Sequence, residues 1–292
     1  MTTTATELAA LLAGAPVGVV GLGLLGGSLS LDLRRQHIHV RGWVHRASTA
    51  ERALARGLVD EAATDPQLLQ GCGLVVLALP LDQLVSPSAE LLAAIPAAAV
   101  SVDLGSVKAP VLAALGSRLP RFVPCHPMAG TALAGVEAGQ PDLFKGRPWV
   151  ITPGPAVDAG ALAMARALGA ALGGELLQCD ASDHDRAVAL ISHLPVLVAA
   201  ALLQTASSAE PDSVAALAKA LASSGFADTS RVGGGNPELG TLMAQYNREA
   251  LMPALAAYEQ QLAQLRGLVD QQQWTALQTQ LSDCQQLRPQ FL

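Results

Sequence analysis

The histidine at position 126 is the residue of this chain whose type and setting best suit acid–base chemistry. It stands between Pro124 and Pro127, shortly after an apolar run that begins at residue 122. Each proline fixes a φ angle and removes a backbone donor, so the pattern predicts a stiff loop at a strand end rather than a central strand. An imidazole held at a set angle can act as a general base, and it can equally be a loop residue that hydrogen-bonds to nearby backbone.

A glycine-rich turn near the start of the chain has the pattern of a nucleotide-binding loop. A β-branched run at residues 16–20 leads into Gly21-Leu-Gly23-Leu-Leu-Gly26, and an apolar helix is predicted to follow. The first glycine allows a tight turn, the second lets backbone approach a pyrophosphate, and the third lets the helix pack on the strand. The flanking strand and helix favour a dinucleotide site over a plain turn. The residues expected to bind the cofactor here are Gly21, Gly23, Leu24, Leu25 and Gly26, with Leu79 and Pro80 at the end of a later strand.

The end of the second predicted strand, at residues 39–44, bears on which dinucleotide is bound. A carboxylate that would bind the ribose hydroxyls of NAD is expected there, and the sequence has no acid before Glu51. Arg46 stands there instead, where it can hold the 2′-phosphate of NADP or lie in solvent at a helix start. The missing acid and the present base together favour NADP. The residues expected to contact this end of the cofactor are His45, Arg46, Ser48 and Thr49.

Strands alternate with helices throughout the first 179 residues, which is typical of an α/β fold. Apolar runs at residues 73–80, 99–104, 149–153 and 175–179 are separated by helical stretches, and a short acidic turn is expected at Asp60 and Glu61. The alternation predicts a Rossmann-like, doubly wound parallel sheet. Ligands of such sheets bind beyond the carboxyl ends of the strands, where Ser106 and His126 both fall. This placement favours a catalytic role for His126.

The pattern changes after residue 179, because the apolar periodicity becomes helical to the end of the chain. A chain of 292 residues is long enough for two cores. We therefore expect an all-α domain at residues 180–292 after an N-terminal domain at residues 1–179. One long helix is expected to carry an apolar stripe, and such a stripe often packs against a second copy. The stripe consists of Leu239, Leu242, Met243, Tyr246, Ala250, Tyr258, Leu262 and Leu265.

Two histidines lie near the start of this helical domain. His193 precedes Pro195, whose ring frees the carbonyl of Ile191 and bends the helix axis. The bend can turn His193 toward a cleft, while the alternative is a core histidine satisfied by backbone. His184 is expected to be an exposed residue at a helix start.

A glycine-rich segment at residues 225–237 carries an isolated cation, Arg231. So many glycines predict a loop, with a helix beginning at Asn236-Pro237. Arg231 can be a solvated side chain, or it can anchor a carboxylate through a bidentate pair.

The composition argues against several kinds of partner and site. A formal net charge of −6 supplies no basic surface for nucleic acid. The four scattered cysteines include no CxxC pair, so neither a metal site nor a disulfide framework is expected. The first basic residue is Arg34, too late for a secretory signal, and no apolar run reaches the length of a membrane span. A cytoplasmic protein with no membrane partner is therefore expected.

Several of these segments together resemble the prephenate/arogenate dehydrogenase family of tyrosine biosynthesis. The glycine motif is common to many dehydrogenases, whereas HPMAG and SHLP together are specific to this family. The resemblance extends from residue 21 to about residue 249. The matching segments are Gly21-Leu-Gly23-Leu-Leu-Gly26-Gly-Ser, Asp103-Leu-Gly-Ser106-Val-Lys108, His126-Pro-Met-Ala-Gly130-Thr, Ser192-His193-Leu-Pro195, Gly225-Phe-Ala-Asp-Thr-Ser-Arg231, Gly235-Asn-Pro-Glu238 and Asn247-Arg-Glu249.

The resemblance implies roles for the polar residues already singled out. It implies that His126 takes the proton of a ring hydroxyl and that Ser106 hydrogen-bonds near it. It also implies that His193 and Arg231 line the substrate pocket, with Arg231 on a carboxylate, and that the protein is a homodimer through its helical domain. Gly130 and Thr131, which follow His126, are expected to contact the substrate as well.

The reaction implied is an NADP-dependent oxidative decarboxylation of L-arogenate to L-tyrosine. Hydride leaves C4 of a cyclohexadienol for the nicotinamide while His126 removes the hydroxyl proton, and loss of carbon dioxide completes the aromatic ring. The HPMAGT and DTSRVGGGNPELG segments resemble the arogenate-using branch. The alternative within the family is prephenate, which would give 4-hydroxyphenylpyruvate. No metal is needed in either case.

Two alternatives from other classes stay open. A β-hydroxyacid dehydrogenase would use a catalytic lysine in the first helix of the second domain, where this chain has His193 and no lysine before Lys219. A non-catalytic NADP-binding sensor would bind cofactor without turnover. The intact set of Ser106, His126, His193 and Arg231 disfavours the sensor.

Overall fold

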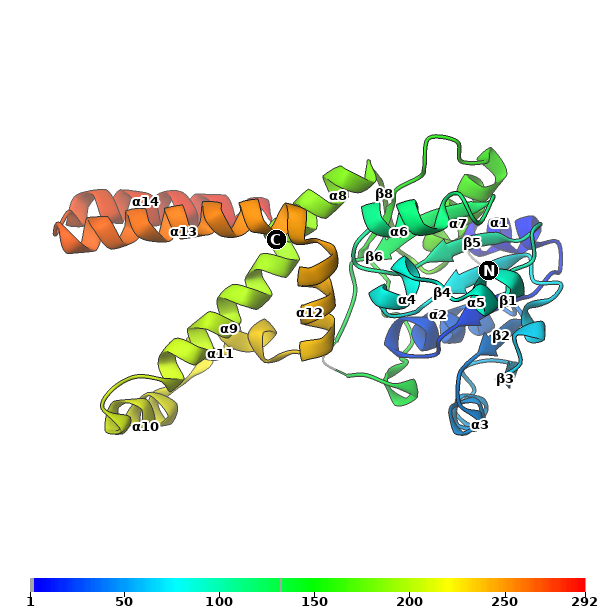
Figure 1. Ribbon diagram of the computed structural model, residues 1–292, viewed down its shortest axis with the longest axis horizontal. Helices are drawn as coiled ribbons and strands as arrows, with labels where there is room; N and C mark the ends of the chain where they lie inside the picture. Colours follow the sequence, from blue (N-terminus) through cyan, green and yellow to red (C-terminus); the bar gives the residue numbers. More distant parts are fainter. Residues whose placement is uncertain (1–2, 132, 292) are drawn as a thin grey trace.

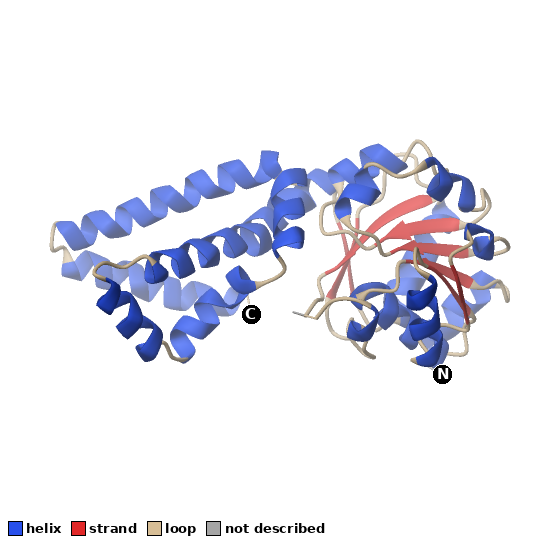
Figure 2. Ribbon diagram, turned by 60° about the horizontal axis from the view of Figure 1, so that its bottom comes forward, coloured by secondary structure: helices blue, strands red, loops and turns tan. Residues whose placement is uncertain are grey.

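The structure is a computed structural model that describes residues 3–131 and 133–291. It has an N-terminal part built on one sheet and a C-terminal part built of helices alone, which extends away from the sheet as an arm (Figures 1 and 2). The α/β class and the helical second part expected from the sequence are both confirmed.

The sheet has eight strands in the order β3-β2-β1-β4-β5-β6-β7-β8. Neighbours are parallel except β6 and β7, which are antiparallel. One edge strand begins at Glu61, where a turn was expected, because Arg41 of the neighbouring strand pairs with it. The strands are β1 (Val17–Val20), β2 (Val40–Trp43), β3 (Glu61–Ala63), β4 (Leu74–Leu77), β5 (Val100–Asp103), β6 (Phe122–Pro127), β7 (Pro148–Ile151) and β8 (Glu175–Gln178).

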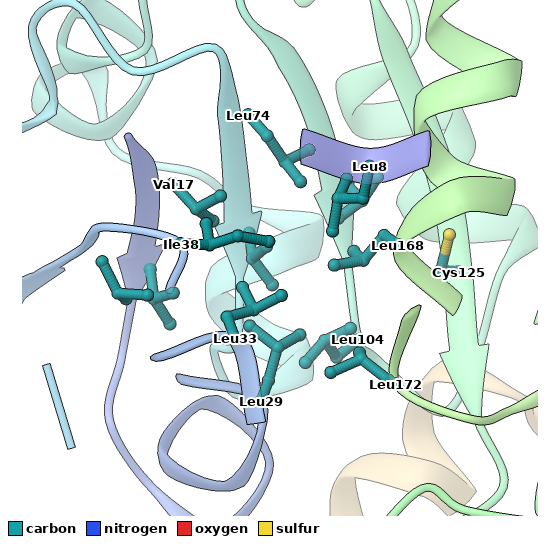
Figure 3. Packing of buried hydrophobic residues seen from close by; sticks show 14 of the residues in the cluster. Leu8, Val17, Leu29, Leu33, Ile38, Leu74, Leu104, Cys125, Leu168 and Leu172 are labelled. Carbon is teal, nitrogen blue, oxygen red and sulfur yellow. The ribbon is translucent and has the colours of Figure 1, made fainter. Parts of the chain in front are cut away.

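Helices cover both faces of this sheet. Successive side chains of a strand point to opposite faces, so the fully apolar strand β4 sends Leu74 and Val76 to one core and Val75 and Leu77 to the other. Figure 3 shows the first core. The elements of this part are α1 (Thr3–Leu12), α2 (Leu24–Arg35), α3 (Ala47–Ala55), α4 (Leu81–Val85), α5 (Ala89–Ala94), α6 (Ala109–Leu115), α7 (Ala159–Ala171) and the 3₁₀ turns η1 (Pro66–Leu69) and η2 (Val136–Ala138).

His126 lies within a central strand, so the expectation of a stiff loop at this position is wrong. β6 pairs with β5 as far as Pro124 and with β7 from Cys125 to Pro127. The strand tolerates both prolines, because Pro124 uses its carbonyl, which accepts the N–H of Thr152 (3.0 Å), and Pro127 is the last residue. The change from a parallel to an antiparallel neighbour occurs next to His126.

The helical part begins with one long rod that leads from the sheet into the arm (Figure 1). The rod consists of α8 (Ala181–Val188), a π-turn η3 (Ala189–His193) and α9 (Leu194–Ser207). The remaining elements are α10 (Asp212–Leu221), α11 (Ser224–Ser230), the 3₁₀ turn η4 (Arg231–Gly234), α12 (Pro237–Tyr246), α13 (Arg248–Asp270), α14 (Trp274–Leu287) and the 3₁₀ turn η5 (Arg288–Gln290).

The segment at residues 225–237 is mostly helical, in place of the expected loop. Gly233 is needed for close packing rather than for backbone flexibility, since a Cβ at this position would lie 2.4 Å from the backbone nitrogen of Ala200 in α9. The helix start at Asn236 is confirmed, because its side chain accepts the N–H groups of Glu238 and Leu239.

The single long helix expected from the apolar stripe is in fact two helices, α12 and α13, which run in different directions (Figure 1). They meet at Asn247, whose side chain is buried and hydrogen-bonded inside the protein. Large apolar side chains of the arm remain exposed on its surface. They include Leu217, Leu221, Leu239, Met252, Leu262, Trp274 and Leu281.

The rod Ala181–Ser207 is long and apolar enough to cross a membrane, judged by length and composition alone. No apolar run of that length was expected from the sequence, whereas α8, η3 and α9 continue one another and the helix passes through Pro195. This resemblance to a span is weak evidence, since a core helix passes the same test. The rod also carries three buried polar side chains, His184, Asp185 and His193.

Candidate active site

Buried polar side chains gather where the sheet meets the helical rod. His126 comes from β6, while His184, Asp185 and His193 come from the rod. All four are at most 8% exposed. Titratable groups are seldom buried together without a function, which makes this cluster the candidate active site.

His126 is hydrogen-bonded to a second histidine. Its Nδ1 lies 2.8 Å from Nε2 of His184, and Nδ1 of His184 lies 2.8 Å from Oδ1 of Asp185. The two imidazole rings meet edge to face, with centroids 5.0 Å apart. The expectation that His184 is exposed is therefore wrong: its place in the first turn of α8 points it inward, at 3% exposure.

Asp185 also joins the rod to the sheet. Its Oδ1 accepts the backbone N–H of Lys108 (2.7 Å) and its Oδ2 accepts that of Ala109 (2.8 Å), at the start of α6. With the contact to His184, the Asp185 carboxylate accepts three hydrogen bonds and fastens the start of the rod to the start of α6.

A second buried ion pair supports the same corner of the sheet. The ammonium of Lys108 pairs with Asp103 of β5, and both side chains are fully buried. Lys108 Nζ also donates to the carbonyl of Cys125 (2.7 Å), next to His126. Burial raises the pKa of the Asp103 carboxyl, while Lys108 and the N–H groups of Gly105 and Cys125 oppose that rise.

His193 lies at the end of the π-turn. The ring of Pro195 removes one donor from the helix, and the N–H of Leu194 reaches back to the carbonyl of Ala189, five residues earlier. The side chain of Asn247 donates to the carbonyl of Asp185 (2.8 Å) and to Nδ1 of His193 (3.0 Å). Because Nδ1 accepts, we assign the proton of the neutral ring to Nε2.

Two of the three histidines of the site, His126 and His193, are held neutral near pH 7. Burial lowers the pKa of His126 well below 6.5, and Lys108, His184 and His193 lower it further. Burial likewise lowers the pKa of His193 to about 4, against the opposing charge of Asp185. A neutral imidazole can accept a proton, as a general base must.

Two buried polar atoms of the site have no hydrogen-bond partner among the described residues. They are Oγ of Ser106, just beyond β5, and Nε2 of His193. An unpaired buried donor costs about 1 to 3 kcal/mol, so such atoms indicate a ligand that would satisfy them. His193 Nε2 presents a donor, and Ser106 presents a hydroxyl that can donate or accept.

The other residues expected to bind substrate are placed outside this contact network. Arg231 is the first residue of η4, which packs on α9; its side chain is exposed and forms no ion pair with any described residue. Gly130 and Thr131 are exposed in the segment after β6, where Thr131 Oγ1 accepts the N–H of Leu133.

A cavity of about 360 Å³ lies at the carboxyl ends of β1 and β2. Of the residues predicted to bind the cofactor, Gly21, Gly23, His45, Arg46, Thr49 and Leu79 line this cavity, whereas Leu24, Leu25, Gly26, Ser48 and Pro80 are not among its lining residues. Arg52 also lines the cavity and was not foreseen; it forms an ion pair with Glu137 (2.9 Å). Its position one turn after Ser48 was the available signal.

The glycines beside this cavity fit a dinucleotide. Gly21 has a φ of +89°, and a Cβ at Gly26 would lie 2.0 Å from the carbonyl oxygen of Gly21, so neither position accepts a side chain. A Cβ at Gly23, the N-cap of α2, would meet nothing within 4 Å. The uncapped amides of α2 therefore face open space that a pyrophosphate can occupy.

Comparisons with known proteins agree with these features. Residues 29–178 match the family model of the prephenate dehydrogenase nucleotide-binding domain, and residues 180–283 match that of the prephenate dehydrogenase dimerization domain. A cyclohexadienyl dehydrogenase of Zymomonas mobilis is 30% identical over 277 residues, 93% of this chain and 94% of that protein.

Solved structures are similar along nearly the whole chain. Arogenate dehydrogenase of Synechocystis is 41% identical, with a TM-score of 0.80 over 95% of this chain and 100% of the other. Prephenate dehydrogenase of Aquifex aeolicus, in complex with hydroxyphenyl propionate and NAD⁺, is 26% identical, with a TM-score of 0.88 over 95% and 98%.

Proposed function

Because the chain belongs to the prephenate dehydrogenase family, whose members are nicotinamide-dependent dehydrogenases, we propose that it catalyses the NADP-dependent oxidative decarboxylation of L-arogenate to L-tyrosine. The observation that carries the proposal is the buried cluster around His126, with the unpartnered Oγ of Ser106 and Nε2 of His193. A neutral base beside two free polar groups suits the deprotonation of a ring hydroxyl.

His126 is the general base of this mechanism. Its neutral imidazole takes the proton of the C4 hydroxyl, so that the C–H electron pair can leave the ring carbon. When bound, the nicotinamide accepts that hydride. Ser106 lies just beyond β5, the strand next to that of His126, and its hydroxyl orients the oxygen that loses the proton. Departure of the ring carboxylate as carbon dioxide then yields an aromatic product.

The remaining polar groups bind the substrate. The Nε2–H of His193 donates to an oxygen of the bound substrate, which satisfies its otherwise unpaired donor. Arg231 binds a carboxylate; its side chain is exposed and has no ion-pair partner in the part of the chain that the structure describes, which leaves it available for this contact. Gly130 and Thr131 contribute from the segment after β6.

We expect arogenate to be preferred over prephenate by at least about 10-fold in kcat/KM, the factor that one added charge-assisted contact would supply. The support is the 41% identity with an arogenate dehydrogenase. The measurement is a spectrophotometric assay that crosses the two substrates with NAD and NADP. Equal kcat/KM values would contradict the preference for arogenate. A higher kcat/KM for prephenate would instead favour a prephenate dehydrogenase. Cofactor binding without turnover of either substrate would favour a non-catalytic sensor.

The cofactor of the proposal is NADP, although the Aquifex aeolicus structure contains NAD⁺. Arg46 and Arg52 both line the cavity at the end of β2, and no carboxylate is among its lining residues. Two guanidinium groups and the hydroxyl of Thr49 suit a phosphate on the ribose.

Replacing Arg46 with alanine should raise the KM for NADP by roughly 10- to 150-fold and leave the KM for NAD nearly unchanged, because a charge-assisted contact contributes about 1.5 to 3 kcal/mol. Initial rates with each cofactor measure this. Arg52→Ala should raise the KM for NADP by less, because this second cation of the cavity is already paired with Glu137. An equal loss for both cofactors in Arg46→Ala would make Arg46 a residue of the fold.

The proposed division of the chain is a nucleotide-binding domain at residues 1–179 and a helical substrate and dimerisation domain at residues 180–292. It is supported by the two family models, which meet between residues 178 and 180. The homodimer is proposed to form through the helical arm, whose exposed Leu217, Leu262 and Trp274 a second copy would cover. A cytoplasmic location is part of the same proposal.

A further inference from the structure

Hydrogen bonds connect His126 to His184 and His184 to the carboxylate of Asp185. The chemistry of these three side chains determines which atom donates in each bond. Asp185 accepts N–H bonds from Lys108 and Ala109, so it is an acceptor for its neighbour as well. Nδ1 of His184, 2.8 Å from Oδ1, must therefore carry a proton. In a neutral imidazole this leaves Nε2 of His184 as an acceptor.

The same reasoning determines the tautomer of His126. Its Nδ1 lies 2.8 Å from the accepting Nε2 of His184, so Nδ1 carries the proton. The lone pair of neutral His126 is then at Nε2, the ring nitrogen that does not contact His184. Which nitrogen is the base thus depends on a histidine and an aspartate of the helical rod.

We propose that His184 and Asp185 are positioning residues, which hold His126 in the tautomer whose Nε2 can take the substrate proton. The inference rests on the proposed role of His126 as the base. The substrate O–H bond breaks and the Nε2–H bond of His126 forms; the protons of His184 stay in place. The Nδ1–H of the resulting imidazolium still donates to Nε2 of His184. The next group in this series of hydrogen bonds is the anionic carboxylate of Asp185.

The charged and titratable groups around His126 make this support necessary. Lys108 from the segment before α6, the charged form of His184 and His193 from the π-turn all disfavour a positive charge on His126. Neutral His184 has the opposite effect, because its Nε2 accepts the Nδ1–H of the imidazolium. The charge of Lys108 is matched by Asp103 of β5. Asp185 is the remaining carboxylate of the cluster, and among the described residues only His184 connects it to His126.

The test compares two replacements of His184 in the full-length protein. In His184→Phe no acceptor faces His126, whereas in His184→Gln the side-chain oxygen can accept from Nδ1. We expect kcat to fall by about 10²-fold in His184→Phe, within the 10² to 10⁴ that a general base contributes, and to recover most of that loss in His184→Gln. The acid limb of the kcat/KM profile should also move to lower pH in His184→Phe, because the imidazolium loses its acceptor.

A merely structural role for His184 would not move the pH profile or favour glutamine. Equal losses in the two variants with an unchanged acid limb, or full activity in His184→Phe, would overturn the proposal. The KM for the cofactor should stay the same in both, as a check that each variant is folded.

A second measurement does not depend on catalysis. The ring-nitrogen NMR shifts of the wild-type protein, with His126 assigned by its absence in His126→Asn, report the tautomer directly. We expect the Nδ1–H form. An Nε2–H form would overturn the inference whatever the substrate is, while an Nδ1–H form in a protein that oxidises neither arogenate nor prephenate would instead count against the proposed function alone.

Discussion

Replacing His126 with asparagine should lower kcat by a factor on the order of 10² to 10⁴, the usual contribution of a general base. Asparagine is the suitable replacement because its side-chain amide can occupy the place of Nδ1 and still donate to Nε2 of His184. The variant therefore keeps the buried hydrogen bond and loses the nitrogen that takes the proton. Steady-state turnover measures the loss, and titration with the reduced cofactor should show unchanged affinity.

The pH dependence of the wild-type enzyme provides an independent check on the same residue. The base must be neutral, so kcat/KM should fall as pH is lowered through the pKa of His126. Burial, Lys108 and the neighbouring histidines place that pKa well below 6.5, so the activity should persist into mildly acidic solution. The asparagine variant should lack this acid limb. Near-normal turnover of the variant, or an identical acid limb, would remove His126 from the role.

Replacing Lys108 with methionine should lower the free energy of unfolding by about 3 to 5 kcal/mol, because it leaves the fully buried carboxyl of Asp103 without its counter-charge. Methionine fills a similar volume, so the loss reports the charge rather than a cavity. Urea titration of the wild type and the variant measures the difference.

Two further variants separate this effect from general damage. Arg186→Gln removes an exposed ion pair with Asp183 and should cost at most about 1 kcal/mol. Adding Asp103→Asn to Lys108→Met should restore part of the loss, since the buried charge is then gone. A loss below about 1 kcal/mol in Lys108→Met would contradict the assignment of this pair as a stabilising one.

The sheet could be predicted from the sequence because its strands are short, continuous apolar runs bounded by glycine, proline or charge. β1, β4 and β5 were each foreseen to within three residues, and the alternation with helices was enough to indicate a doubly wound sheet. β6 was not, because prolines are ordinarily poor in central strands, and sequence alone does not show that Pro124 needs only its carbonyl.

The candidate site was predicted less completely, because apolar periodicity identifies the inner face of a helix only by its apolar residues. The buried positions of α8 are Ala181, His184, Asp185 and Val188, spaced as the inner face of a helix. A search for apolar residues passes over two of the four because they are polar. Had the spacing been weighed above the polarity, His184 and Asp185 would have been placed inside.

Asn247 was missed for a related reason. The apolar stripe of α12 and α13 continues across it, so periodicity predicts a single helix. The break depends on hydrogen bonds to Asp185 and His193, which are more than 50 residues away in the chain. Contacts between such distant residues leave no periodic signal.

The place of Asp185 has a mechanical consequence. Its carboxylate holds two amides of the sheet domain, its neighbour His184 holds the imidazole of β6, and its own carbonyl is held by Asn247 at the α12–α13 break. A hinge at this junction would have to break these bonds and separate the base from its support in every catalytic cycle. The two halves of the molecule should therefore keep a constant angle through turnover, so that substrate enters and product leaves without a hinge motion at this junction.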